Sequence, residues 1–146
     1  MSRYEVLLFL HLLSAFALVA GLVLYYTVLV GARRVASAAD AMPLLRMTGL
    51  ATALWNVGGL GVLVFGVWLA LDVYEIWDAW ILLAIFLWVI ASAAGGPLSN
   101  DYRTASDEGG DAALATVRAS RTSLLLAVAS AASFALLLVM IFKPGA

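Results

Sequence analysis

The residue in this chain with the clearest capacity for chemistry is its single histidine, His11. It lies inside an apolar stretch that runs from about Val6 to Val30, where an ionisable side chain is costly. A residue of this type in a membrane-spanning segment normally has a partner or a task. His11 is therefore the first candidate for a functional site.

A small set of polar residues can share an interior with this histidine. His11, Ser14 and Tyr25 fall on one face of a predicted helix, because their spacing follows the helical repeat. On the second apolar stretch, Thr52 and Asn56 share a face. The helical rise places His11 and Asn56 within about 6 Å of each other in membrane depth. We therefore expect Ser14, Tyr25, Thr52 and Asn56 to form a polar interior around His11.

The simplest interpretation of this polar interior is structural. Hydrogen bonds between membrane helices contribute about 0.6 to 2 kcal/mol, and a bond between His11 and Asn56 would be one of them. The protein would then be a non-enzymatic membrane component without a cofactor. Its role would be that of a structural or assembly partner, either for another membrane protein or within a homo-oligomer.

The alternative interpretation is a redox subunit that binds haem b through His11. A neutral imidazole at this depth in a helical bundle is a common iron ligand. Because the chain has no second histidine, the sixth ligand would be Met140, His11 of a second copy, or absent. A third interpretation is a small-solute transporter coupled to protons. Such a transporter normally needs a carboxylate inside the membrane, whereas Glu5, Asp72 and Asp78 lie at or beyond the ends of the apolar stretches.

The elements that must position these residues are membrane helices. The chain has 146 residues, of which 65% are hydrophobic and 12% are charged, a composition too apolar for a soluble domain. Four continuous stretches are long enough to cross about 30 Å of hydrocarbon at about 1.5 Å per residue: about 4–30, 47–71, 76–94 and 122–142. The sequence therefore predicts one all-α domain, 1–146, folded as a four-helix transmembrane bundle in a lipid bilayer.

The segments between the spans carry turn-forming residues. Pro43 precedes the second span, Pro97 follows the third and Pro144 follows the fourth. The stretches 95–101 and 106–111 are rich in glycine and short polar residues and are predicted to be loops. From about Asp111 to Arg121 the pattern is compatible with a helix that extends the fourth span beyond the membrane.

The distribution of basic residues predicts the orientation. With four spans, Arg3 and Lys143 lie on the side that holds both termini. The other side holds six arginines: Arg33, Arg34, Arg46, Arg103, Arg118 and Arg121. The positive-inside rule places the six arginines in the cytoplasm and both termini outside a bacterial inner membrane. The chain has no cysteine for a thiolate metal site and a net charge of -1, which gives no reason to expect a nucleic-acid partner.

The stretch 9–21, Phe-Leu-His-Leu-Leu-Ser-Ala-Phe-Ala-Leu-Val-Ala-Gly, resembles the opening helix of the DUF2269 family of small bacterial integral membrane proteins, whose pattern is F-L-H-x-L-x-A-x-x-W-V-G-G. The matching positions are His11, Leu13, Ala15, Val19 and Gly21. Leu18 and Ala20 stand where the family has tryptophan and glycine. The stretch is also similar to the first helix of CopD-type copper-resistance domains and of HemJ-type protoporphyrinogen oxidases. The resemblance implies a small four-span membrane fold and leaves the function unassigned.

Overall fold

The protein is an all-α bundle in a computed structural model that describes residues 2–74 and 77–144. Within these residues the chain forms six helices and no strand: α1 (Arg3–Arg34), α2 (Ala38–Leu45), α3 (Thr48–Val73), α4 (Ala79–Glu108), α5 (Gly110–Arg118) and α6 (Ser120–Phe142). Four helical segments are long and apolar enough to cross a membrane. The predicted all-α class is therefore confirmed, and the start predicted for the third span, at 76, lies outside the described residues.

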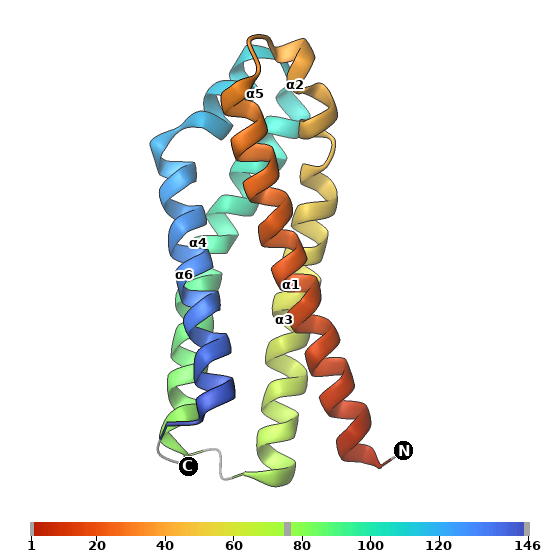
Figure 1. Cartoon of the computed structure of the whole chain (residues 1–146), viewed down its shortest axis with the longest axis vertical. Coiled ribbons are helices and arrows are strands. Elements are labelled where there is room, and N and C mark those ends of the chain that lie inside the picture. Colours follow the sequence, from red (N-terminus) through yellow and green to blue (C-terminus); the bar gives the residue numbers. More distant parts are fainter. Residues whose placement is uncertain (1, 75–76, 145–146) are drawn as a thin grey trace.

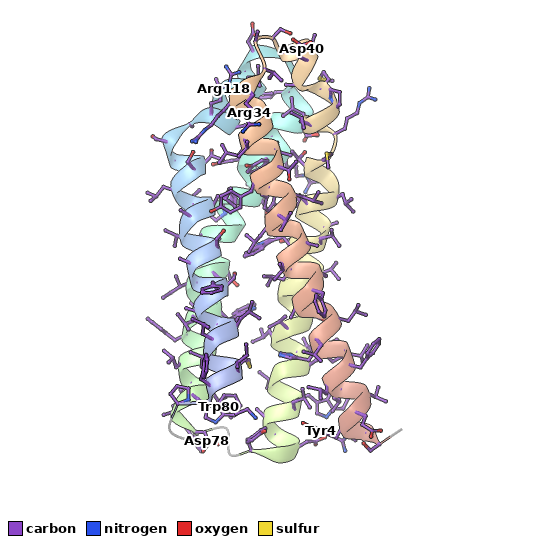
Figure 2. All side chains as sticks on the ribbon, viewed as in Figure 1. Tyr4, Arg34, Asp40, Asp78, Trp80 and Arg118 are labelled. Carbon is purple, nitrogen blue, oxygen red and sulfur yellow. The ribbon has the colours of Figure 1, made fainter. Side chains whose placement is uncertain are left out.

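The four long helices are arranged as two antiparallel pairs (Figure 1). Helix α1 packs along α3, and α4 packs along α6, while contacts between the pairs are fewer. The short helices α2 and α5 lie together at one end of the bundle, which we call the α2–α5 end. Both termini lie at the opposite end, which we call the terminal end. Figure 2 places Tyr4, Asp78 and Trp80 at the terminal end and Arg34 and Arg118 at the α2–α5 end.

Close backbone approach holds α1 against α3. A Cβ atom added to Gly21 would lie 2.7 Å from the backbone nitrogen of Trp55, and one added to Gly58 would overlap the backbone of Leu18. Only glycine fits at these two contacts, since any side chain would push the helices apart. Small residues allow this kind of approach in membrane helix pairs, where van der Waals packing replaces the hydrophobic effect.

Helix α4 is longer than predicted, because Pro97 and the stretch 95–101 lie inside it rather than in a loop. An internal proline lacks the N–H that would bond to the preceding turn, which disfavours a helix. Tertiary burial outweighs this cost here. The buried residues of this part of α4 recur on one helical face: Ala91, Ala94, Gly95, Leu98, Ser99, Tyr102 and Ala105. In Figure 1 the cyan part of α4 leans toward α1 and α3, so this face completes the core.

The segment before the last span also differs from its prediction. Residues 110–118 form a helix of their own, α5, instead of a continuous extension of α6. The two helices are separated at Ala119, whose backbone is extended with φ -57° and ψ 142°. The Arg118 side chain then turns back to α1, where its Nε donates to the carbonyl of Ala32 at 2.8 Å and its terminal nitrogen donates to that of Val35 at 2.7 Å. A cation at a helix C-terminus is favourable, so α5 also caps α1.

The main core lies toward the α2–α5 end, where side chains of all six helices meet. The outer surface of the long helices is apolar. Between 22% and 33% of each spanning window is buried inside the protein, and large residues such as Phe16, Val57 and Ile141 are exposed. Apolar surface on this scale requires an apolar solvent. The bundle therefore has the surface of a multi-pass protein in a lipid bilayer.

Candidate ligand cleft

A cleft separates the two helix pairs in the half of the bundle near the terminal end. Its volume is about 370 Å³, and side chains of all four long helices line it. The walls are mostly aliphatic, as in Leu12 of α1, Val62 of α3, Ala84 of α4 and Leu136 of α6. The ribbons diverge here in Figure 1. An apolar cavity of this size with a few polar groups is the usual form of a small-molecule site.

The predicted candidate His11 lies in the wall of this cleft. Its imidazole stands against Gly66 of α3, where an added Cβ would lie 2.9 Å from its Cε1 atom and 3.2 Å from Nδ1. Gly66 therefore leaves the space that the ring occupies. Within the described residues, Nδ1 is buried without a hydrogen-bond partner.

Two further polar atoms of the cleft share this property. Trp80 Nε1 of α4 and Ser133 Oγ of α6 are also buried and lack a hydrogen-bond partner among the described residues. Both side chains line the cleft, and the two residues are only 5% and 3% exposed, respectively. Together with His11 Nδ1, they are the only such side-chain atoms in the described part of the chain. Three different helices thus bring unpaired polar atoms to one apolar cleft.

The hydroxyl of Ser133 is buried but differs from those of three other serines in the long helices. In Ser14, Ser123 and Ser130 the hydroxyl donates to the carbonyl four residues earlier, at 2.7, 3.2 and 2.7 Å. This local bond is the ordinary way for a serine to satisfy its hydroxyl within a helix. Ser133 does not form it within the described residues. Its hydroxyl is therefore free to bond to an occupant of the cleft.

Polar contacts mark both ends of the cleft. Toward the core, the indole nitrogen of Trp88 donates to the carbonyl of Gly59 at 2.9 Å and so links α4 to α3. At the terminal end, the ammonium group of Lys143 donates to the Tyr74 hydroxyl at 2.6 Å. The same ammonium lies 5.5 Å from the ring centre of Trp80. The cleft is thus bounded by an indole at its inner end and by a cation with aromatic rings at its mouth.

A separate polar cluster lies in the core beyond the cleft. The Tyr25 hydroxyl donates to Thr52 Oγ1 at 3.0 Å and is 3.0 Å from Ser99 Oγ. The Tyr102 hydroxyl donates to the backbone carbonyl of Tyr25 at 3.0 Å, and the two rings are in contact, tilted by 38° with centres 4.6 Å apart. These bonds join α1, α3 and α4. Because the hydroxyls are paired with one another and with the backbone, this cluster is a structural link.

The structure places the predicted site residues in different parts of the bundle. Met140 lines the cleft together with His11, whereas Tyr25 and Thr52 belong to the core cluster. Ser14 lies in the interface between α1 and α3, where its hydroxyl occupies the space that a Cβ atom on Gly61 would need. The predicted polar face of the first helix therefore does point inward, toward α3.

The predicted contact between His11 and Asn56 is wrong. His11 stands against Gly66, and Asn56 lies ten residues earlier in α3, about 15 Å away along the axis. Asn56 is also exposed, in the lining of a second, smaller groove, so it does not belong to the polar interior. Helix α3 turns its glycines toward α1, which leaves Asn56 on another face.

Sequence reasoning missed Ser99, Tyr102, Trp80 and Ser133 as interior polar residues. The spacing of Ala91, Ala94, Leu98, Tyr102 and Ala105 was a usable signal for the first two, because it continues the helical repeat through the glycines and Pro97. No sequence signal separates Ser133 from the neighbouring small residues of the last span.

Comparisons with known proteins do not identify the cleft. No family model, curated protein or solved structure matches the chain significantly. Within the described residues, no group of three or more His, Cys, Asp or Glu side chains is placed to hold a metal ion. The assignment of a function therefore depends on the cleft itself.

Proposed function

We propose that this protein binds a small apolar molecule in the cleft between its two helix pairs. The observation that carries the proposal is the convergence of His11 Nδ1, Trp80 Nε1 and Ser133 Oγ on that cleft. More than about nine in ten buried polar groups in proteins have a hydrogen-bond partner. Three unpaired groups in one cavity are explained if an occupant of that cavity supplies the partners.

The proposed setting is a bacterial inner membrane with both termini outside. Its support is the contrast between the six arginines toward the α2–α5 end and the two basic residues, Arg3 and Lys143, at the terminal end. In this orientation the cleft lies in the outer half of the membrane. A molecule dissolved in the outer leaflet would enter it without crossing the bilayer.

Photolabelling with an apolar trifluoromethyl phenyldiazirine tests the proposal on the full chain in lipid nanodiscs. Labelling of a cleft residue such as Leu136 should saturate with probe concentration, because the site is finite. Labelling of the exposed residue Phe134 should rise in proportion to the probe, since that side chain is 64% exposed and faces lipid.

Cleft-filling and matched control variants make this experiment specific. Ala15 lines the cleft, so Ala15→Phe should remove the saturable labelling. Ala20 is an exposed residue of the same helix, so Ala20→Phe should leave it intact. Labelling of Leu136 that never saturates in the wild type would show that no small-molecule site exists.

If the protein is instead an assembly partner, the occupant of the cleft is a protein segment and not a small molecule. In that case an apolar helix of another membrane protein, or of a second copy, would occupy it. The cleft residues would then be protected from the diazirine in the native membrane and would become labelled after the complex is dissociated. This result would contradict the small-molecule proposal.

A second candidate occupant is haem b, which is favoured by one observation: His11 and Met140 line the same cleft from opposite helix pairs. Imidazole and thioether together are a known pair of haem ligands. Protein purified from haem-supplemented cells would then show a Soret band in proportion to protein. The band should disappear in His11→Gln, because an amide is a poor iron ligand, and it should shift in Met140→Leu. A colourless wild type would contradict haem binding.

A further inference from the structure

The unpaired atoms of the cleft also restrict the chemistry of its occupant, given the proposed function. An indole N–H is a hydrogen-bond donor only, so Trp80 requires an acceptor on the ligand. The hydroxyl of Ser133 can donate, and a neutral imidazole such as that of His11 has one nitrogen that donates and one that accepts. Trp80 and Ser133 can therefore donate to the same kind of ligand atom, an acceptor oxygen.

These donors lie at two levels of the cleft. Ser133 and Trp88 line both the cleft and the smaller groove that adjoins it on its core side, so Ser133 lies at the inner end of the cleft. Trp80 precedes Trp88 by eight residues in α4, which places it about 12 Å nearer the terminal end. Apolar side chains line the space between the two levels.

His11 lies closer to the outer of these levels. It stands against Gly66, whereas the indole at the inner end bonds to Gly59, seven residues earlier in α3. This separation corresponds to about 10 Å along the helix. The cleft thus offers His11 and Trp80 near its mouth and Ser133 at its inner end.

We infer that the cleft accepts a membrane quinone, a molecule in which an apolar ring carries carbonyl oxygens at opposite positions. One carbonyl would accept from Trp80 and the other from Ser133, with a hydrogen bond of about 2.9 Å at each end. The apolar walls would contact the ring and its hydrocarbon tail. A simple alkyl chain fits less well, because it would leave all three polar atoms unpaired.

A fatty acid also fits less well than a neutral quinone. Its carboxylate would have to remain near the mouth, where Lys143 is the basic residue of the lining, because burial of a charge is costly. Its hydrocarbon tail would then face Ser133 at the inner end and leave that hydroxyl without a partner. A ligand with an uncharged polar atom deep in the cleft, such as a carbonyl oxygen, satisfies Ser133.

Competition against the diazirine label tests this inference with two probes that differ in their acceptors. Decylubiquinone carries the carbonyl oxygens, and decylbenzene has a ring and tail of similar size without them. Decylubiquinone should suppress the saturable labelling at a concentration at least about tenfold lower than decylbenzene does, the effect expected of one or two hydrogen bonds.

Variants at the two levels should weaken the quinone alone. Ser133→Ala and Trp80→Phe should each reduce the potency of decylubiquinone about two- to tenfold. Both should leave decylbenzene unchanged, which also shows that the cleft is still folded. The matched controls are Ser130→Ala, whose hydroxyl is bonded within its helix, and Trp68→Phe, an exposed indole. Neither control should change either probe.

The outcomes separate this inference from the proposed function. Saturable labelling that both probes displace equally, or that decylubiquinone does not displace, would overturn the quinone assignment and leave a cleft for another apolar molecule. A selective effect of decylubiquinone that Ser133→Ala and Trp80→Phe do not alter would also overturn it. Labelling that does not saturate at all would overturn the proposed function instead.

Discussion

Replacement of Tyr25 by phenylalanine removes one hydroxyl that connects three helices. Tyr25 is fully buried, and its hydroxyl oxygen lies 3.0 Å from both Thr52 Oγ1 of α3 and Ser99 Oγ of α4. Interhelical hydrogen bonds in membrane proteins average about 0.6 kcal/mol, with a maximum near 1.7 kcal/mol. Two such bonds predict that Tyr25→Phe lowers the free energy of unfolding by about 1 to 2 kcal/mol. Reversible unfolding in mixed detergent and dodecyl sulfate micelles would measure this difference.

The neighbouring residue provides the control for this experiment. Tyr26 is 41% exposed, so Tyr26→Phe should change the unfolding free energy by less than about 0.5 kcal/mol. The double variant Tyr25→Phe with Ser99→Ala should cost less than the sum of the two single changes by about 0.5 kcal/mol or more, because the same bond is removed in both. A stability of Tyr25→Phe equal to that of the wild type, or strict additivity with Ser99→Ala, would refute this account of the cluster.

Two further predictions concern helix packing and orientation. Gly58→Leu should destabilise the bundle by about 3 kcal/mol or prevent its folding, since a Cβ there overlaps the backbone of Leu18. Gly49→Leu should be tolerated, because Gly49 faces open space. Equal unfolding free energies of the two variants in mixed micelles would contradict the close contact. For orientation, a cysteine in place of the exposed Ala79 should react with a membrane-impermeant thiol reagent in intact cells, and one in place of the exposed Ser106 should react only after permeabilisation. The opposite pattern would reverse the proposed topology.

The sequence was sufficient to predict the fold class and the inward-facing side of one helix, α1. Apolar stretches of about 20 residues have few structural solutions in a bilayer, so the four spanning helices were predictable. On α1 the polar atoms of His11, Ser14 and Tyr25 are confined to one stripe, and this contrast with the other faces identified the side that packs on α3. Helix α3 lacks such a contrast, which is why Asn56 was assigned to the wrong face.

The site itself could not be predicted in the same way, because it depends on contacts between distant segments. Pro97 was predicted to end a helix from its local chemistry, whereas burial of Leu98, Tyr102 and Ala105 against other helices keeps it inside α4. In the sequence, Ser130 and Ser133 are both serines among small apolar residues of the last span, and nothing distinguishes them. Only the packed structure shows that one hydroxyl is bonded within α6 while the other remains unpaired at the cleft.

The division of the bundle into two pairs also has a consequence for its order of assembly. Helices α1 and α3 are joined through α2, and α4 and α6 are joined through α5, so each pair is a contiguous helical hairpin. A hairpin of neighbouring helices forms from contacts that are local in the chain and therefore closes early. The first hairpin ends at Val73 and can close before α4 has been synthesised. Docking of the second hairpin then depends on the polar bonds of Ser99 and Tyr102 to Tyr25, which act as the late, register-setting contacts of biogenesis.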